Sequence, residues 1–206
     1  MADRPRIVLF CEDRGHELFV RALVDRLAAE LHMRPVLQAP STRGGHARAL
    51  EEFKVWQRSF LRQATYGIPD LLVLVIDANC SPWNDVRREL EAAIDEAVMP
   101  HHVVGCPDPH VERWYIADPV AFQQVVGVQP GRDREKCDPR FYKQLIDEAL
   151  GGAGIPLLTG PADLAPDLVA AMDFYRAGRT QPSLRHFVDE LRGRLRRLAD
   201  SRFPPP

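Results

Sequence analysis

The feature that most constrains the fold is a run of six apolar residues at positions 71–76, LLVLVI. A strand that is apolar on consecutive residues is typical of the centre of a parallel sheet, where helices cover both faces. Three further short apolar runs, at 7–11, 35–38 and 103–106, have the length of strands. The sequence therefore predicts a parallel sheet with a buried central strand.

Segments with apolar residues at helical spacing separate these runs. The first follows residues 7–11, a second covers about 46–66, and a third covers about 83–98. Strands that alternate with helices in this way predict a doubly wound α/β sheet with right-handed crossovers.

The pattern changes after about residue 127. A short helix is predicted at 111–117 before this point, helices near 138–150, 162–175 and 183–200 follow it, and strand signals after residue 106 are confined to a weak one at 155–158. We therefore expect an α/β domain over residues 1–127 and a helical C-terminal extension over 128–206, packed on the sheet.

Acidic side chains follow three of the predicted strands. Glu12 comes after the first, Asp77 after the central one, and Glu112 after the next along the chain. Ligands of parallel sheets bind outside the carboxyl ends of the strands. Carboxylates gathered there repel one another unless they share protons or bind a hard cation. Mg²⁺ or Mn²⁺ is the expected ion, because oxygen ligands select hard divalent metals.

Two of these strand ends carry a family resemblance. The segment 7–19, IVLFCEDRGHELF, is a strand that ends in Glu12 and leads into a helix, and it resembles the opening motif of Toprim domains. The segment 71–79, LLVLVIDAN, is similar to their second motif, a buried strand ending in Asp-x-Asp.

Two later segments resemble one branch of this superfamily, the small proteins related to OLD-family nucleases. A Pro-x-x-x-x-Glu-x-Trp-x-x-x-Asp element matches residues 107–118, with Glu112, Trp114 and Asp118 in place, and a terminal element matches 182–192. The resemblance implies a Toprim-like, Rossmann-like fold and an Mg²⁺- or Mn²⁺-dependent nuclease, more an endonuclease than an exonuclease. It further implies a part in bacterial defence against phage together with a separate ATPase.

From this resemblance we expect one ion on Glu12, Asp77 and Asn79, with Glu17 and Glu112 able to hold a second. Glu12, Asp77 and Glu112 are the predicted catalytic residues, with Glu12 as general base. Asn79 stands where the family has a second aspartate, which removes one negative charge. A non-catalytic binding module with a weakened metal site is therefore the alternative hypothesis.

Each site residue also has a simpler explanation. Glu12 and Asp13 can cap the helix that follows them, because acids are favourable near a helix N-terminus. Asp77 can be an ordinary loop residue, and Trp114 is expected to be an anchor of the core.

The formal net charge of −2 hides a separation of charges along the chain. Basic residues lie on one side of the helix after Gly45 and on one flank of the last helix, where they can contact a nucleic-acid backbone without reading its sequence. The alternatives are a solvated face and, for the last helix, an acidic partner. The predicted nucleic-acid-binding residues are Arg43, Arg48, Lys54, Arg58, Arg62, Arg185, Arg192 and Arg196.

The remaining expectations concern location and cysteines. No apolar stretch approaches the roughly 20 residues of a membrane span, and no export signal precedes the first strand, so we expect a cytoplasmic protein without a membrane partner. The four cysteines include no CxxC pair, which argues against a disulfide framework and a zinc ribbon.

Overall fold

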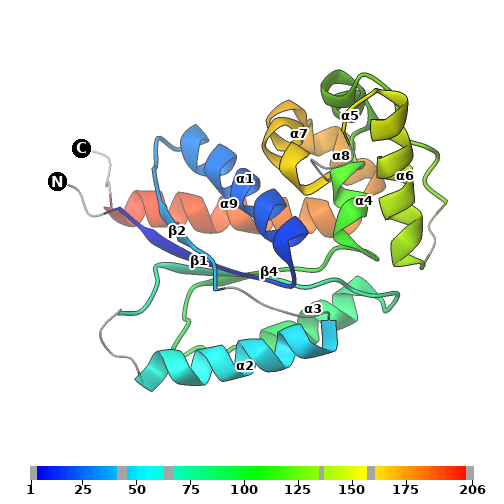
Figure 1. Cartoon of the computed structure of the whole chain (residues 1–206). Helices are drawn as coiled ribbons and strands as arrows, with labels where there is room; N and C mark the ends of the chain where they lie inside the picture. Colours follow the sequence, from blue (N-terminus) through cyan, green and yellow to red (C-terminus); the bar gives the residue numbers. More distant parts are fainter. Residues whose placement is uncertain (1–3, 41–45, 63–66, 135–136, 157–160, 203–206) are drawn as a thin grey trace.

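The computed structural model describes residues 4–40, 46–62, 67–134, 137–156 and 161–202, and is an α/β structure built on a parallel sheet. In the described residues the sheet has four strands in the order β2-β1-β3-β4 (Figure 1). The strands are β1 (Arg6–Cys11), β2 (Val36–Gln38), β3 (Leu71–Val75) and β4 (His102–Gly105). The prediction of a parallel sheet with the 71–76 run at its interior is confirmed.

The strand order places a topological switch between β1 and β3. From β1 the chain goes first to β2 on one side, and then crosses back to β3 on the other side. β1 and β3 pair in parallel from Ile7 opposite Leu71 to Cys11 opposite Val75. In open parallel sheets, ligands bind at such a switch, outside the carboxyl ends of the two strands.

Helices cover both faces of the sheet (Figure 1). On one face, α2 (His46–Arg62) and α3 (Trp83–Ala92) pack on the side chains of Val8, Phe10 and Leu74. On the other face, α1 (Arg14–Glu30) and α9 (Pro182–Arg202) pack on the alternate strand residues. Every residue of β3 is buried, which explains why its sequence does not alternate between apolar and polar.

The remaining helices gather beyond the carboxyl ends of the strands (Figure 1). They are α4 (Val111–Tyr115), α5 (Pro119–Val126), α6 (Pro139–Gly152), the 3-10 helix η3 (Pro161–Leu164), α7 (Ala165–Ala171) and α8 (Phe174–Thr180). Residues of these helices and of α9 belong to the same core cluster as β1, β3 and α1. The chain on either side of residue 127 therefore shares one hydrophobic core.

The single helix expected at 162–175 is wrong. The backbone becomes extended at Met172, and Asp173 then caps α8 by accepting hydrogen bonds from the backbone N–H groups of Tyr175 and Arg176. The helix expected at 83–98 ends at Ala92, and residues 155 and 156 form no strand. The rest of the expected strand, residues 157–158, lies outside the described residues.

Trp114 is the centre of the contact between α4 and α9. Its ring is fully buried and stacks on Phe187 with the ring centroids 5.4 Å apart, and its indole N–H donates to the hydroxyl of Ser183 at 3.0 Å. This agrees with the expected role of Trp114 as a core anchor. Gly105 allows α9 to lie close to β4, because a Cβ atom there would come within 2.9 Å of the Phe187 ring.

Within the described ranges, the helices are all too short or too polar to cross a lipid bilayer.

Candidate metal centre

Glu12 and Asp77 meet at the switch between β1 and β3. Glu12 directly follows β1, and Asp77 is the second residue after β3. Both residues are at least nine-tenths buried. The carboxylate of Glu12 accepts a hydrogen bond from the backbone N–H of Asp77 at 3.1 Å, and the N–H of Glu12 donates to the carbonyl of Val75. The sheet thus fixes both residues relative to each other.

His16 joins the two acids from the first turn of α1. Asp13 is the N-cap of this helix, and its carboxylate accepts from both the backbone N–H of His16, at 3.0 Å, and the ring Nδ1, at 2.7 Å. The other ring nitrogen, Nε2, lies 2.7 Å from Oδ1 of Asp77. His16 is only 1% exposed, so its ring is held between two carboxylates in the interior.

The two carboxylates favour the protonated form of His16. Burial alone would lower the pKa of its imidazole, but Asp77 and Asp13 outweigh burial and raise that pKa well above the usual value. For Asp77, burial would raise the pKa, yet His16 and His110 reverse the direction and hold it below its usual range. The ion pair of a protonated His16 with Asp77 is therefore favoured in the interior.

Glu12, His16 and Asp77 form a possible metal-binding group, which we call the Glu12–His16–Asp77 cluster. One ligand atom from each lies within 4.8 Å of the other two, and all three residues are buried. Two carboxylates and an imidazole are ligands for divalent transition metals, and the carboxylates alone suit Mg²⁺ and Mn²⁺.

His110 supports Asp77 from the opposite side. Its Nδ1 lies 3.1 Å from Oδ2 of Asp77, so both oxygens of Asp77 contact histidine rings. Its Nε2 is buried and has no hydrogen-bond partner among the described residues. A carboxylate that is oriented by two neighbouring rings is held in one position, as the carboxylates of metal centres are.

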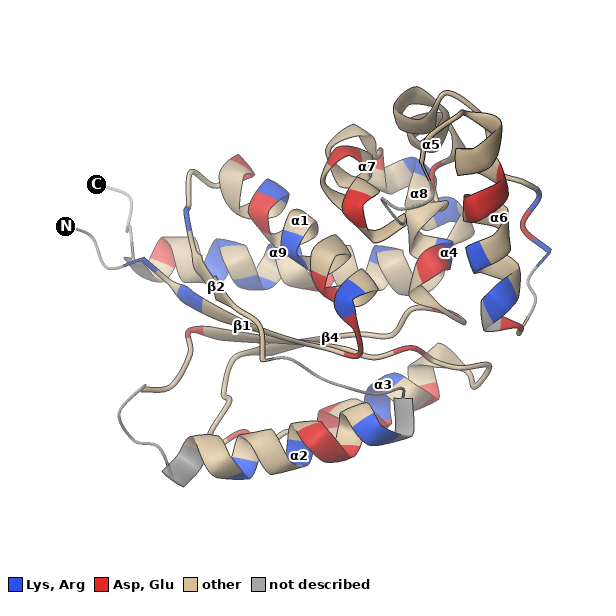
Figure 2. Cartoon of the chain, viewed as in Figure 1, with Lys and Arg blue, Asp and Glu red and all other residues tan. Residues whose placement is uncertain are grey.

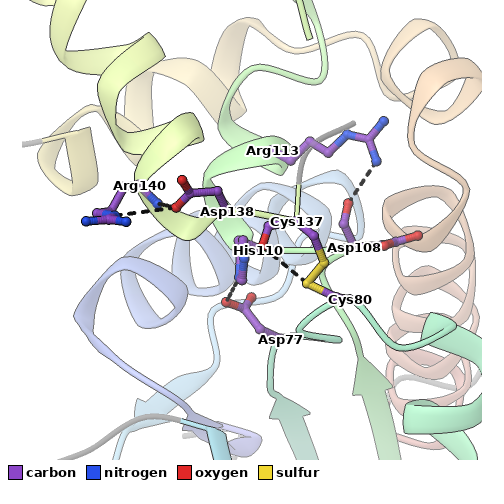
Figure 3. The surroundings of a disulfide bond; sticks show 8 residues. All are labelled: Asp77, Cys80, Asp108, His110, Arg113, Cys137, Asp138 and Arg140. Carbon is purple, nitrogen blue, oxygen red and sulfur yellow. Dashed lines mark hydrogen bonds and ion pairs between the residues drawn. A yellow bond between two sulfur atoms is a disulfide. The ribbon is translucent and has the colours of Figure 1, made fainter. Parts of the chain in front are cut away.

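A disulfide lies beside this part of the site (Figure 3). Cys80, three residues after Asp77, is bonded to Cys137, just before α6, so the bond ties the loop after β3 to the helical half of the chain. The sequence argued against disulfide pairing, and for this pair it was wrong, because the fold brings together cysteines 57 positions apart. Cys11 and Cys106 are buried and lie outside this disulfide, and burial raises the pKa of both thiols.

The other predicted ligands lie outside the cluster. Glu17 pairs with Arg21 at 2.9 Å and lines a separate cavity of about 220 Å³ with Asp13 and Pro40. Asn79 is exposed in a left-handed turn with φ of 46°, where its N–H donates to the carbonyl of Pro109.

Glu112 lies near the cluster without belonging to it. Its side chain is largely buried and is 3.5 Å from the ammonium of Lys143 on α6. Burial raises the pKa of Glu112, and the positive charge of Lys143 only partly opposes this. The same Lys143 charge acts on Asp13, so this residue of the helical half faces the acidic edge of the sheet.

Sequence reasoning missed His16, His110 and Lys143. The available signal was the position of His16, four residues after Glu12 in CEDRGHE. A helix that starts at residue 14 places His16 in its first turn, next to the end of the strand. The suggestion that an acid caps this helix was right for Asp13.

The predicted basic residues are distributed unevenly. On α2 acidic residues lie among the basic ones (Figure 2): Arg48 lies 3.7 Å from Glu52, and Lys54 lies 2.8 Å from Glu51. Arg58 is exposed. On α9, Arg185 and Arg192 lie near Asp189, and Arg196 is exposed. Arg43 and the side chain of Arg62 lie outside the described residues.

Comparisons with known proteins give no relative: no family model, no curated protein and no solved structure matches the chain. The Toprim resemblance therefore rests on the motifs in the sequence. The structure shows the coarser class, a parallel α/β sheet compatible with a Rossmann-like fold, with acids at its switch point.

Proposed function

We propose that this protein is a Toprim-like phosphodiesterase that cleaves nucleic acid with a divalent metal ion, Mg²⁺ or Mn²⁺. One observation carries the proposal: Glu12, His16 and Asp77 bring three ligand atoms within 4.8 Å of one another at the switch point of a parallel sheet. This is the place where such sheets bind ligands, and carboxylates are the ligands of catalytic Mg²⁺ and Mn²⁺.

The residues present fit a hard or borderline divalent ion. Glu12 and Asp77 supply oxygen ligands on rigid strand ends, and His110 holds Asp77 in place. His16 is already positioned 2.7 Å from Asp77 and supplies a nitrogen once its proton leaves. A mixed set of oxygen and nitrogen ligands favours Mn²⁺ over Mg²⁺, because Mg²⁺ binds few imidazoles.

A divalent ion at this site supplies a counter-charge for the phosphate and a bound water of lowered pKa. Glu12 and Asp77 would hold it, and His16 and His110 would orient Asp77. Lys143, which is exposed and next to the acidic edge, would attract the phosphate as a point charge.

A second candidate is the non-catalytic binding module. The observation in its favour is that both Asp77 oxygens already contact histidine nitrogens, Nε2 of His16 at 2.7 Å and Nδ1 of His110 at 3.1 Å, so protonation of His16 would balance the charge of Asp77. A cluster balanced in this way can remain folded without any ion. In this case the protein would bind nucleic acid or a partner and leave it intact.

A cleavage assay separates the two candidates. Plasmid DNA and labelled single-stranded DNA and RNA are incubated with Mg²⁺ or Mn²⁺ and the wild type, Glu12→Gln, Asp77→Asn or the control Glu96→Gln. Glu96 is exposed in the segment before β4, at the opposite edge of the sheet. Loss of a ligand is expected to reduce cleavage at least about a hundredfold, since even residues that only support ligands are worth 10–100-fold.

Equal cleavage by the wild type and both ligand variants would exclude this site as the catalytic centre. Nucleic-acid binding by the wild type without cleavage under any metal would favour the binding module. A role in phage defence, a separate ATPase partner and a cytoplasmic location stay predictions.

A further inference from the structure

A groove lies between α8, α9 and the first residue of α3. Two neighbouring cavities of about 240 and 520 Å³ form it, and they share the residues Gly178, Arg179, Arg185 and Asp189. The smaller one extends to Tyr175 and Arg192, and the larger one extends to Trp83 and His186. We call this surface the α8–α9 groove. No part of the candidate metal centre lines it.

Gly178 sets the shape of the groove. A Cβ atom at this position would come within 2.9 Å of the Cβ of Arg185, so only glycine lets α8 lie this close to α9. The close approach leaves the long side chains of Arg179 and Arg185 to extend outward. The groove is therefore a built feature of the helix packing.

The charge of the groove is positive. Three arginines line it against one acid, Asp189. Asp189 lies 3.8 Å from Arg185 and 4.0 Å from Arg192, and Arg185 and Asp189 are well exposed. Exposed ion pairs at such distances contribute about 0–1 kcal/mol, so a phosphate can replace them. Arg179 has no ion pair with any residue that the structure describes.

Aromatic rings stand at the two ends of the groove. Tyr175 lines one end and is 81% exposed, which is unusual for a large aromatic side chain. Trp83 is half-buried and lies against His186 with the ring centroids 5.4 Å apart. Alternating aromatic rings and arginines are the common features of proteins that bind single-stranded nucleic acid, where the bases stack and the phosphates meet the cations.

We propose that the α8–α9 groove binds a single-stranded segment of nucleic acid. Phosphates contact Arg179, Arg185 and Arg192, and a base stacks on Tyr175. A duplex fits less well, because its bases are stacked on one another inside the helix and cannot stack on the exposed ring of Tyr175. An acidic peptide would satisfy the arginines but would leave the exposed ring of Tyr175 without a stacking partner.

The groove and the candidate metal centre lie toward the same end of the sheet. Trp83 starts α3, and the loop before it, which begins after β3, carries Asp77 and Cys80. Figure 1 shows that α3 and α9 both begin on the side where the strands end. This inference rests on the proposed function, for which the groove would hold the substrate strand next to the cleavage site.

The test measures binding with cleavage switched off. Fluorescence anisotropy follows a labelled oligothymidylate in EDTA with the wild type, the double variant Arg179→Gln/Arg185→Gln, Tyr175→Ala and the control Arg34→Gln. Arg34 is exposed before β2, at the other end of the sheet. Arg179 and Arg185 are both exposed, so the double variant is expected to fold, which circular dichroism checks.

The double variant is expected to bind at least about tenfold more weakly, with a log–log salt dependence shallower by about 1.4, or about 0.7 for each lost phosphate contact. Tyr175→Ala is expected to weaken binding about tenfold, the effect of losing one stacked base. Arg34→Gln is expected to bind as the wild type does.

Binding by the double variant equal to that of Arg34→Gln would overturn the inference. Tighter binding of a matched duplex, or displacement of the oligonucleotide by a polyglutamate peptide at equal concentration, would do so as well. The proposed function and this inference can fail separately. If binding depends on the groove but no Mn²⁺-dependent cleavage occurs, only the nuclease proposal is refuted. If cleavage depends on Glu12 but the groove variants bind as the wild type does, only the groove proposal is refuted.

Discussion

Two charged regions of this protein differ in what their charges do. In the Glu12–His16–Asp77 cluster the side chains are buried, with His16 2.7 Å from Asp77 and the Glu12 carboxylate 3.1 Å from the backbone N–H of Asp77. In the α8–α9 groove Arg179 and Arg185 are exposed, and Arg185 is 3.8 Å from Asp189. Removing one partner from a buried pair costs about 3–5 kcal/mol, whereas exposed pairs contribute about 0–1 kcal/mol.

The buried charges of the cluster stabilise the fold, whereas the exposed charges of the groove are available to a ligand. The charges of the cluster help to hold the loops after β1 and β3, so they are positioned before any ligand arrives. Arg179 and Arg185 contribute little to the fold and are available to a phosphate, whereas Arg192 is partly buried and also lies 3.7 Å from Glu30. Substitutions in the two regions should therefore change different measured quantities.

The largest effect is expected for Asp77→Ala. This change leaves the imidazolium of His16 and the ring of His110 buried without their shared carboxylate. We expect the free energy of unfolding, measured with urea, to fall by about 4 kcal/mol. A loss below about 1 kcal/mol would show that the cluster does not hold its loops, and the contrast with the groove would disappear.

The disulfide between Cys80 and Cys137 is expected to have the next largest effect. The bond closes a loop of 57 positions, and its replacement by Cys80→Ser/Cys137→Ser should lower the free energy of unfolding by about 3 kcal/mol. Dithiothreitol should destabilise the wild type by a similar amount and leave the double variant unchanged. Mass spectrometry of unreduced peptides that finds no linked pair would contradict the disulfide.

Asp118 connects the groove to the buried core. Its carboxylate accepts from the backbone N–H of Asp173, at the N-cap of α8, and from the guanidinium of Arg176. Asp118→Asn should lower the free energy of unfolding by about 2 kcal/mol at pH 7, because hydrogen bonds to charged groups contribute about 1.5–3 kcal/mol.

The effect of Asp118 should depend on pH. Burial would raise the pKa of Asp118, but the hydrogen bonds from Arg176, Asp173 and Ala121 outweigh it and hold that pKa below its usual value. A lowered pKa gives stability that is present above the unfolded-state pKa, about 4, and is lost as the pH falls further. The difference between the wild type and Asp118→Asn should therefore shrink below about pH 4, and a constant difference would contradict this role.

The smallest effect on stability is expected for Arg185→Gln in the groove. The side chain is exposed, and its only described ion pair, with Asp189, is 3.8 Å long. The free energy of unfolding should change by less than about 0.5 kcal/mol, as is usual for surface substitutions. A loss of 2 kcal/mol or more would mean that the groove arginines support the fold, against the distinction drawn above.

Much of the sheet and its acidic edge was predictable from sequence. The apolar runs determine the strands, and parallel pairing then brings Glu12 and Asp77 to the same edge without further information. His16 was not predictable in the same way, because a polar residue inside a helix gives no periodic signal of its contacts. Its position depends on the start of α1, which the Asp13 cap determines.

The groove and the disulfide depend on tertiary packing. The apolar spacing continues across Met172, so periodicity predicts one helix, while the Asp173 cap and the hydrogen bonds to Asp118 start a second one in another direction. Cys80 and Cys137 are brought together only by the docking of the helical half. Contacts between segments that are far apart in the sequence cannot be predicted from local sequence patterns.

Mn²⁺ binding tests the metal centre most directly. Electron paramagnetic resonance measures free and bound Mn²⁺ in a titration of the wild type, Asp77→Asn and the control Glu96→Gln. The wild type and the control are expected to bind Mn²⁺. Asp77→Asn is expected to lose at least about 1.4 kcal/mol of binding free energy, which corresponds to a dissociation constant about tenfold larger. Equal Mn²⁺ binding by all three proteins, or none by the wild type, would contradict a metal centre at Glu12, His16 and Asp77.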